Sequence, residues 1–292
     1  MSIVYKASDA RLGNIVRAIK EIRPTGGLHP DERAEAIRLF RREAEMLATL
    51  DHANLPKVYD FFLENGGHYL VMDYIDGWDL RWMMNNRRDE LSQDWIVQLL
   101  VQLCDALGYL HSQKPSIIFR DAKPSNIMIS RAGELKLIDF GLTIPAQKEY
   151  FLPGNRTGTP LYMAPEQWRA EQPVPATDQY ALGVTIYQLL TGQVPFQAPT
   201  PYGLMHKHLH ETPTPPHVLR PHLPPSLAAS LERALAKSPG ERFPSVTAFA
   251  QTFERAAAGE AGEDTQFLTR PLEGRPPVLV STPSPPPSAA FV

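Results

Sequence analysis

The stretch that decides the fold of this chain is FRDAKPSN at residues 119–126, which is followed after twelve further residues by DFG at 139–141. The first stretch places the carboxylate of Asp121, the ammonium group of Lys123 and the amide of Asn126 in one short loop. The second adds the carboxylate of Asp139 on a turn that contains a glycine. Phosphoryl transfer from a metal-bound nucleotide needs a base near the acceptor hydroxyl, a cation on the moving phosphate and oxygen ligands for Mg²⁺. The order and spacing of the two stretches therefore predict a phosphoryl-transfer site.

The same two stretches closely resemble the catalytic loop and the metal-binding turn of eukaryotic-type (Hanks-type) Ser/Thr protein kinases of bacterial type. The resemblance runs from about residue 3 to residue 253. It implies a two-lobed α+β fold, with a small antiparallel β lobe that holds one helix, a larger mainly helical lobe, and an active site in the cleft. It also implies ATP as the phosphoryl donor, Mg²⁺ with Mn²⁺ as an alternative metal, and protein Ser/Thr hydroxyls as acceptors, including those of the chain itself.

Composition sets limits on the function. The chain has 292 residues, of which 43% are hydrophobic, so it can bury a large core and divide into two lobes. A net charge of −3 gives no electrostatic case for a nucleic acid or an anionic membrane as partner. The single cysteine, Cys104, excludes an internal disulfide and lies in an apolar helical pattern, which predicts a packed thiol. No apolar stretch is long enough for a membrane span, so we expect a soluble, cytoplasmic protein.

The resemblance implies a protein kinase domain over 1–257, with a small lobe over about 1–75 and a large lobe over about 76–257. Hydrophobic periodicity predicts the strands and helices within it. The small lobe is expected to contain strands at 3–7, 15–22, 57–62 and 69–74 and a helix at 31–50. The large lobe is expected to contain helices at 92–113, 176–191, 225–237 and 245–257 and short strands at 127–129 and 135–138. Residues 258–292 are rich in Pro, Gly, Ser and Thr and lack a sustained period, which predicts a disordered tail.

Lys20 ends the stretch VRAIK at 16–20, which is similar to the third-strand motif of the family. The resemblance implies that its ammonium group holds the α- and β-phosphates and that Glu43 fixes its position. Glu45 is the competing acid, but it lies about 200° around the helix from Glu43 and is expected to face solvent.

The remaining catalytic roles also follow from the resemblance. Asp121 would accept or orient the proton of the acceptor hydroxyl. Lys123 would neutralise charge on the γ-phosphoryl group, and its place two residues after Asp121 resembles the Ser/Thr-specific branch. Asn126 and Asp139 would be the metal ligands.

The adenine pocket is expected around the strand that ends near residue 75. In the family the adenine edge is read by main-chain groups, which here belong to Asp73 and Ile75. The side chains assigned to this pocket are Val4, Ala18 and Met128 around the ring, Met72 at the rear and Asp79 on a ribose hydroxyl.

The activation segment would run from Asp139 to Glu166. Thr159 would contact Asp121 and Lys123 and help to select a hydroxyl-bearing acceptor, and Thr157 is a candidate phosphorylation site because Arg120 is available to pair with a phosphate.

Four further residues receive structural roles from the resemblance. Glu166 and Arg242 would form the buried ion pair of the large lobe, and Asp178 would support the catalytic loop. Phe119, where the family usually has His or Tyr, is expected to pack in an apolar column with Leu47, Val58 and Phe140.

The resemblance breaks at the N-terminus. The glycine-rich loop of the family would end at Val4, so its first strand and leading glycines are expected to be absent here. Three explanations stay open. Met1 is an internal residue of a longer protein, or the chain is a natural kinase that works poorly alone or is completed by a partner, or it is a catalytically silent or weakly nucleotide-binding pseudokinase that acts as a signalling scaffold. The intact Lys20, Glu43, Asp121 and Asp139 favour an active enzyme.

Two other features of the sequence have plain structural interpretations. His206, His208 and His210 alternate, as metal ligands can, but no Cys or carboxylate completes a site, which favours a solvated helix end. Threonines near 265, 269 and 282 could be phosphorylated and recognised by phosphothreonine-binding modules, although an unmodified linker is the better default.

Overall fold

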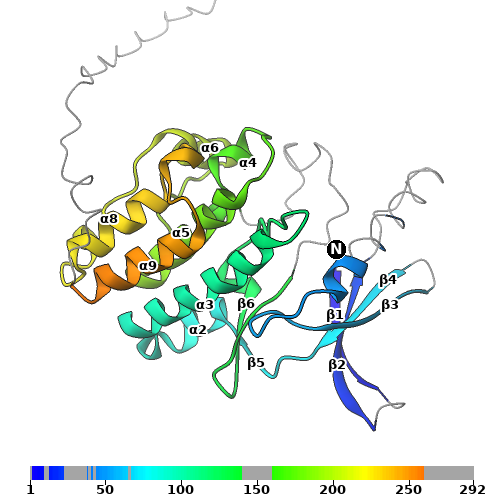
Figure 1. Ribbon diagram of the computed structural model, residues 1–292. Helices are drawn as coiled ribbons and strands as arrows, with labels where there is room; N and C mark the ends of the chain where they lie inside the picture. Colours follow the sequence, from blue (N-terminus) through cyan, green and yellow to red (C-terminus); the bar gives the residue numbers. More distant parts are fainter. Residues whose placement is uncertain are drawn as a thin grey trace, which may run out of the picture.

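The computed structural model describes residues 2–9, 13–22, 38, 41, 44–64, 67–139 and 160–259. They form two lobes, one built on a strongly twisted sheet and one built mainly of helices (Figure 1). This is the two-lobed α+β fold that the sequence predicts. Residues 260–292, which hold nearly all of the predicted tail and its threonines, lie outside the described residues.

The small lobe is a four-stranded antiparallel sheet of order β1-β2-β4-β3. Its turn between β1 and β2 has left-handed backbone at Gly13 (φ +71°) and Asn14 (φ +64°), residue types that tolerate this conformation. All four predicted strands are confirmed. Their bounds are Ser2–Asp9 for β1, Ile15–Ile22 for β2, Val58–Glu64 for β3 and Gly67–Asp73 for β4.

The helix predicted at 31–50 is described only in part. Residues 44–48 are helical, and so are Arg38 and Arg41. Ala44 and Leu47 are buried while Glu45 is exposed, as its predicted position on the solvent face requires. Glu43 lies outside the described residues.

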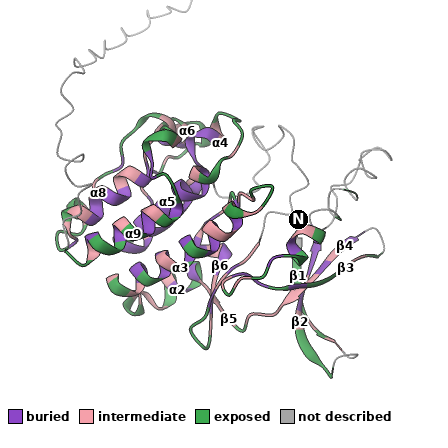
Figure 2. Ribbon diagram, in the orientation of Figure 1, coloured by how far each residue is buried: buried purple, intermediate pink, exposed green. Residues whose placement is uncertain are grey.

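The large lobe is organised around two long helices. The predicted helix at 92–113 is α3, Gln93–Ser112, which begins where the Ser92 hydroxyl accepts from Trp95 N, and the one at 176–191 is α5, Pro175–Thr191. Almost all of α5 is buried, because the other helices surround it (Figure 2). The remaining helices are α2 (Leu80–Asn86), α4 (Pro165–Trp168), α6 (Pro201–His210), α7 (Pro216–Leu219), α8 (Pro225–Ala234) and α9 (Val246–Ala257).

A small three-stranded sheet, of order β5-β6-β7, carries the segments that are predicted to be catalytic, at the junction of the lobes. Its strands are β5 (Gly77–Asp79), β6 (Ile127–Ser130) and β7 (Leu135–Leu137). The sequence predicts β6 and β7, whereas β5 was missed because three residues are too few to show a period.

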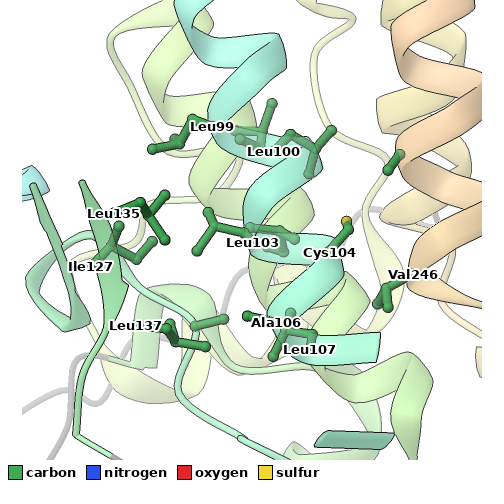
Figure 3. Packing of buried hydrophobic residues seen from close by; sticks show 14 of the residues in the cluster. Leu99, Leu100, Leu103, Cys104, Ala106, Leu107, Ile127, Leu135, Leu137 and Val246 are labelled. Carbon is green, nitrogen blue, oxygen red and sulfur yellow. The ribbon is translucent and has the colours of Figure 1, made fainter. Parts of the chain in front are cut away.

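Helix α3 packs between this small sheet and α9 (Figure 3). Leu103 points toward Ile127 and Leu135, whereas Cys104 lies on the side of Val246. Cys104 is 1% exposed, and its burial raises the pKa of the thiol far above its ordinary value, so the predicted packed thiol is confirmed. None of the helices in the described ranges combines the length and the apolar composition that a membrane crossing requires.

His208 corrects the prediction of a solvated helix end. It lies four residues after Leu204 on the inward face of α6 and is fully buried, while His206 and His210 on the other face are exposed. The Tyr180 hydroxyl and His208 Nδ1 are 2.9 Å apart, and burial together with the charge of Lys237 lowers the pKa of His208 to about 3. His208 is therefore a neutral core residue.

Candidate active site

The catalytic loop holds Asp121, Lys123 and Asn126 in direct contact. Lys123 Nζ lies 2.6 Å from Asp121 Oδ2, and Asn126 Nδ2 donates to the same oxygen at 2.9 Å and to the Asp121 carbonyl at 2.9 Å. Both hydrogen bonds from described side chains end on Oδ2, which leaves Oδ1 for another group. Asp121 keeps 42% of its side chain exposed, whereas Asn126 is buried. The hydrogen bonds thus hold the loop in place, while the Asp121 side chain stays accessible to solvent.

Asp178, at the start of α5, holds this loop in place. Its two carboxylate oxygens accept from the backbone N–H of Phe119 at 2.8 Å and of Arg120 at 2.6 Å, and Oδ2 also lies 2.8 Å from His111 Nε2. Arg120 has left-handed backbone (φ +70°), a costly conformation for a residue with a side chain. These contacts are those that the predicted supporting role of Asp178 requires.

Replacing Asp178 by Ala is expected to destabilise the protein by about 2–4 kcal/mol, because the buried N–H of Phe119 and the partly buried N–H of Arg120 lose their acceptor. Activity should fall as well, since the backbone around Arg120 is no longer held. Urea unfolding and a phosphorylation assay measure the two effects. Asp51→Ala, at a carboxylate that is 83% exposed, is the matched control and should change neither. Equal stability of the two variants would contradict the supporting role.

Asp139 lies just after β7 of the small sheet. Its backbone is also left-handed (φ +67°), and the preceding residue, Ile138, donates from its N–H to the Asn126 carbonyl at 2.8 Å. The Asp139 carboxylate forms an ion pair with the ammonium group of Lys20. The structure therefore brings together the predicted phosphate-binding lysine and a predicted metal ligand. The predicted partner of Lys20, Glu43, stays a prediction.

Strand register places four predicted residues on one face of the small lobe. Val4 pairs with Lys20 across β1 and β2, and Ala18 pairs with Met72 across β2 and β4. Cross-strand partners share a face, and residues two apart on a strand share it too, so all four side chains project to the same side. Ala18 and Lys20 are buried, whereas Val4 is 62% exposed. This is the arrangement expected of one wall of a nucleotide pocket.

The segment that joins the lobes carries the other predicted pocket residues. Asp79 pairs with Met128 across β5 and β6, and its carboxylate accepts from Trp82 N at 2.9 Å, which caps α2. One carboxylate oxygen is thus used in the cap, which leaves the other for the predicted ribose contact. Ile75 is half-buried between the two sheets.

Asp73 has a role that the sequence did not reveal. Its carboxylate accepts from the Tyr59 hydroxyl at 2.7 Å and from Lys57 N at 2.9 Å, and it lies 3.4 Å from Arg17, whose guanidinium covers the Tyr59 ring at 3.5 Å. The side chain thus fixes the strand end whose main chain is predicted to contact adenine.

The ion pair predicted in the large lobe is present and bidentate. Arg242 Nη1 and Nη2 each donate at 2.8 Å to one oxygen of Glu166, and both side chains are buried. Burial by itself raises the pKa of Glu166, but the hydrogen bonds and charge of Arg242 outweigh it and hold that pKa below its ordinary value. Leu47, Val58 and Phe119 lie in one buried cluster, as the predicted column requires.

Several predicted residues are outside the described part of the chain and stay predictions. They are Glu43, Phe140, Thr157 and Thr159. Two supports of the loop were missed by sequence reasoning: His111 beside Asp178, and Thr185, whose hydroxyl donates to the Ala122 carbonyl at 2.8 Å. A threonine within the apolar run of α5 was the available signal for the second.

The donor set fits a divalent cation of the Mg²⁺ type. Asn126 directs its amide nitrogen at Asp121, and its Oδ1, which accepts a long hydrogen bond from Ser125 Oγ at 3.4 Å, stays the predicted metal ligand together with the carboxylate of Asp139. In the described ranges no three His, Cys, Asp or Glu side chains gather in a metal-binding cluster. Such a small set of protein ligands suits Mg²⁺, which is usually bound by one or two carboxylates together with substrate phosphates and waters.

Comparisons with known proteins agree with this geometry. The family described as "Protein kinase domain" matches residues 1–253. A probable serine/threonine-protein kinase of Streptomyces coelicolor is 33% identical over 268 residues, 89% of this chain and 38% of its own length. The serine/threonine-protein kinase pkn3 of Myxococcus xanthus is 36% identical over 261 residues, 85% of this chain and 46% of its own. The chain therefore spans less than half the length of these relatives.

Solved structures are similar as well. The PknI kinase domain of Mycobacterium tuberculosis matches with a TM-score of 0.66 and 27% identity, covering 87% of this chain and 90% of that one. The structure described as "PpkA-294 apo form" matches with a TM-score of 0.69 and 26% identity, covering 86% of this chain and 91% of that one.

Proposed function

Because this chain belongs to the protein kinase family, we propose that it transfers the γ-phosphoryl group of ATP to Ser and Thr hydroxyls of proteins, its own included. Membership of the family implies a nucleotide and a divalent metal as cofactors and protein substrates. The proposal specifies ATP as the phosphoryl donor, Mg²⁺ with Mn²⁺ as an alternative metal, and Ser/Thr hydroxyls as acceptors.

The proposal rests on the loop in which Lys123 and Asn126 both contact the Asp121 carboxylate. A hydrogen bond from Ile138 N to the Asn126 carbonyl joins this loop to the segment that contains Asp139. In the proposed reaction, Oδ1 of Asp121 accepts a hydrogen bond from the acceptor hydroxyl and orients its oxygen for in-line attack on the γ-phosphorus. Lys123, two residues away, stabilises the negative charge that spreads over the transferred phosphoryl oxygens.

The nucleotide would lie against the face formed by Val4, Ala18 and Met72, with its phosphates toward Lys20. Asp139 and Asn126 are the residues proposed to hold a divalent metal, which would neutralise negative charge on the phosphates. Lys20 and Asp139 are paired with each other here, so they would exchange that contact for the phosphates and the metal when the nucleotide binds.

A pseudokinase scaffold is the alternative function, and it is less well supported. A protein that has lost catalysis has no need to keep Lys20, Asp121, Asn126 and Asp139 together in one site. The proposal extends to phosphorylated threonines of this chain as ligands for phosphothreonine-binding modules, a partner class that would follow from autophosphorylation.

The test is incubation of the purified chain with γ-labelled ATP, Mg²⁺ and a generic acceptor protein, followed by phosphoamino acid analysis. Labelled phosphoserine or phosphothreonine is expected. Label on tyrosine alone would overturn the acceptor class, and nucleotide binding without any label would favour the pseudokinase.

A further inference from the structure

A cavity of about 290 Å³ lies on the large lobe among the start of α3, the end of α5 and the segment after α7. None of its lining residues belongs to the proposed catalytic or nucleotide site. Three of them are basic or imidazole side chains, namely Arg88, Arg220 and His222, and none is acidic. The remaining walls are largely leucine and isoleucine, for example Ile96 and Leu223. The cavity therefore has both apolar and cationic lining residues.

The end of α5 brings the two arginines together. Gly192 terminates this helix with left-handed backbone (φ +90°), and a Cβ placed on it would lie 3.3 Å from Arg88 Nη2 and 3.9 Å from Arg220 Nη2. Arg88 Nη2 also donates to the Leu189 carbonyl at 3.0 Å, so its guanidinium is fixed by the helix end. Two positive groups thus approach the same point from different parts of the chain.

Among the residues that the structure describes, the two arginines have no acid as an ion-pair partner, and the side chain of Arg220 makes no hydrogen bond. Burial and the charge of Arg220 together lower the pKa of Arg88. Arg88 is half-buried, whereas Arg220 and His222 are exposed at the rim, so a ligand can reach all three.

The start of α3 also makes the electrostatic potential in the cavity more positive. Ser92 and Gln93, at the first turn of this twenty-residue helix, line the cavity. The positive end of a helix dipole favours a bound anion, an effect that reinforces the arginines. Asp94 in the same turn is exposed and is not part of the lining.

We propose that this cavity binds a small phosphomonoester, with its phosphate on Arg88 and Arg220 and its organic part against the apolar wall. Two forked guanidinium groups match a dianionic phosphate better than a single carboxylate, because each can donate two parallel hydrogen bonds. The volume of about 290 Å³ lies just below the range for ligand pockets, roughly 300–1,000 Å³, which selects a small compound. The site does not depend on catalysis, so it is separate from the proposed function.

The test uses phenyl phosphate as the probe and isothermal titration calorimetry as the measurement. Saturable binding is expected in the unaltered chain and equally in Lys20→Met, which removes the cation predicted to bind phosphates at the nucleotide site. Arg220→Gln should weaken binding roughly tenfold or more, because it removes a charge-assisted contact. Arg255→Gln, at an exposed arginine of α9, is the matched control and should leave binding unchanged.

Thermal unfolding separates a ligand site from a purely structural role of Arg220. Without ligand, Arg220→Gln should unfold at the same temperature or higher, because repulsion with Arg88 is relieved. If that variant does not fold, Arg220→Lys keeps the charge but loses the fork, and it should bind phenyl phosphate more weakly than the unaltered chain. Absence of saturable binding, binding undiminished in the Arg220 variants, or equally tight binding of benzoate would each overturn the proposal.

Discussion

Asp121→Ala is expected to lower the rate of phosphoryl transfer by a factor on the order of 10²–10⁴, the range over which positioned acid–base groups act. In the proposed mechanism this carboxylate faces the acceptor hydroxyl, with Oδ2 engaged by Lys123 and Asn126 and Oδ1 available. Stability should change little, because the side chain is 42% exposed. A steady-state assay with ATP and an acceptor protein measures the rate, and thermal unfolding checks the fold.

Asp105→Ala is the matched control for this variant. Asp105 is an aspartate of α3 whose side chain is 74% exposed, and it contacts only His52 among the ion pairs of the described residues. It should keep full activity. An Asp121→Ala protein that is folded and retains most of its activity would remove Asp121 from the proposed mechanism.

Arg242→Met is expected to destabilise the large lobe by about 3–5 kcal/mol, because it leaves the carboxylate of Glu166 buried without a counter-charge. Arg242 also donates to the carbonyls of Ala176 at 2.7 Å and Ala236 at 2.9 Å, which lose their partner in the same variant. Urea unfolding at neutral pH measures the loss. Arg255→Met, on the exposed face of α9, should change stability by less than about 0.5 kcal/mol.

The pH dependence of stability provides an independent check on this ion pair. The pKa of Glu166 is lowered in the folded state, so its contribution is present above the pKa of an unfolded glutamate and is lost as the pH falls through the folded-state value. Adding Glu166→Gln to Arg242→Met should restore part of the lost stability, since the unpaired charge is removed. An Arg242→Met protein as stable as the Arg255→Met control would contradict the account.

Much of the fold could be predicted from the sequence because it depends on patterns among residues that are close together in the chain. The strands of the small lobe and helices α3, α5, α8 and α9 follow from hydrophobic periodicity, whereas α6, which is as long as α8, was not predicted. The loop at 119–126 follows from the residue types that phosphoryl transfer needs. The bounds of α3 differ from the prediction by one residue at each end. Ser92 caps the start of the helix. Such features depend on neighbours in sequence.

What the sequence could not reveal depends on contacts between distant segments. His208 appeared to be a solvated residue because its burial comes from Tyr180 and Phe196, which lie outside its own helix. The pairing of Lys20 with Asp139 joins residues 119 positions apart. The cavity that contains Arg88 and Arg220 likewise exists only once α5 has brought the two segments together.

The measurement that tests the central claim most directly is transfer of labelled γ-phosphate by the unaltered chain, by Asp121→Asn and by Asp139→Asn in one experiment. The account predicts label on Ser or Thr with the unaltered chain and almost none with either variant, although both should remain folded. Equal labelling by all three proteins would show that the loop at 119–126 and the turn at 139–141 do not form the catalytic site.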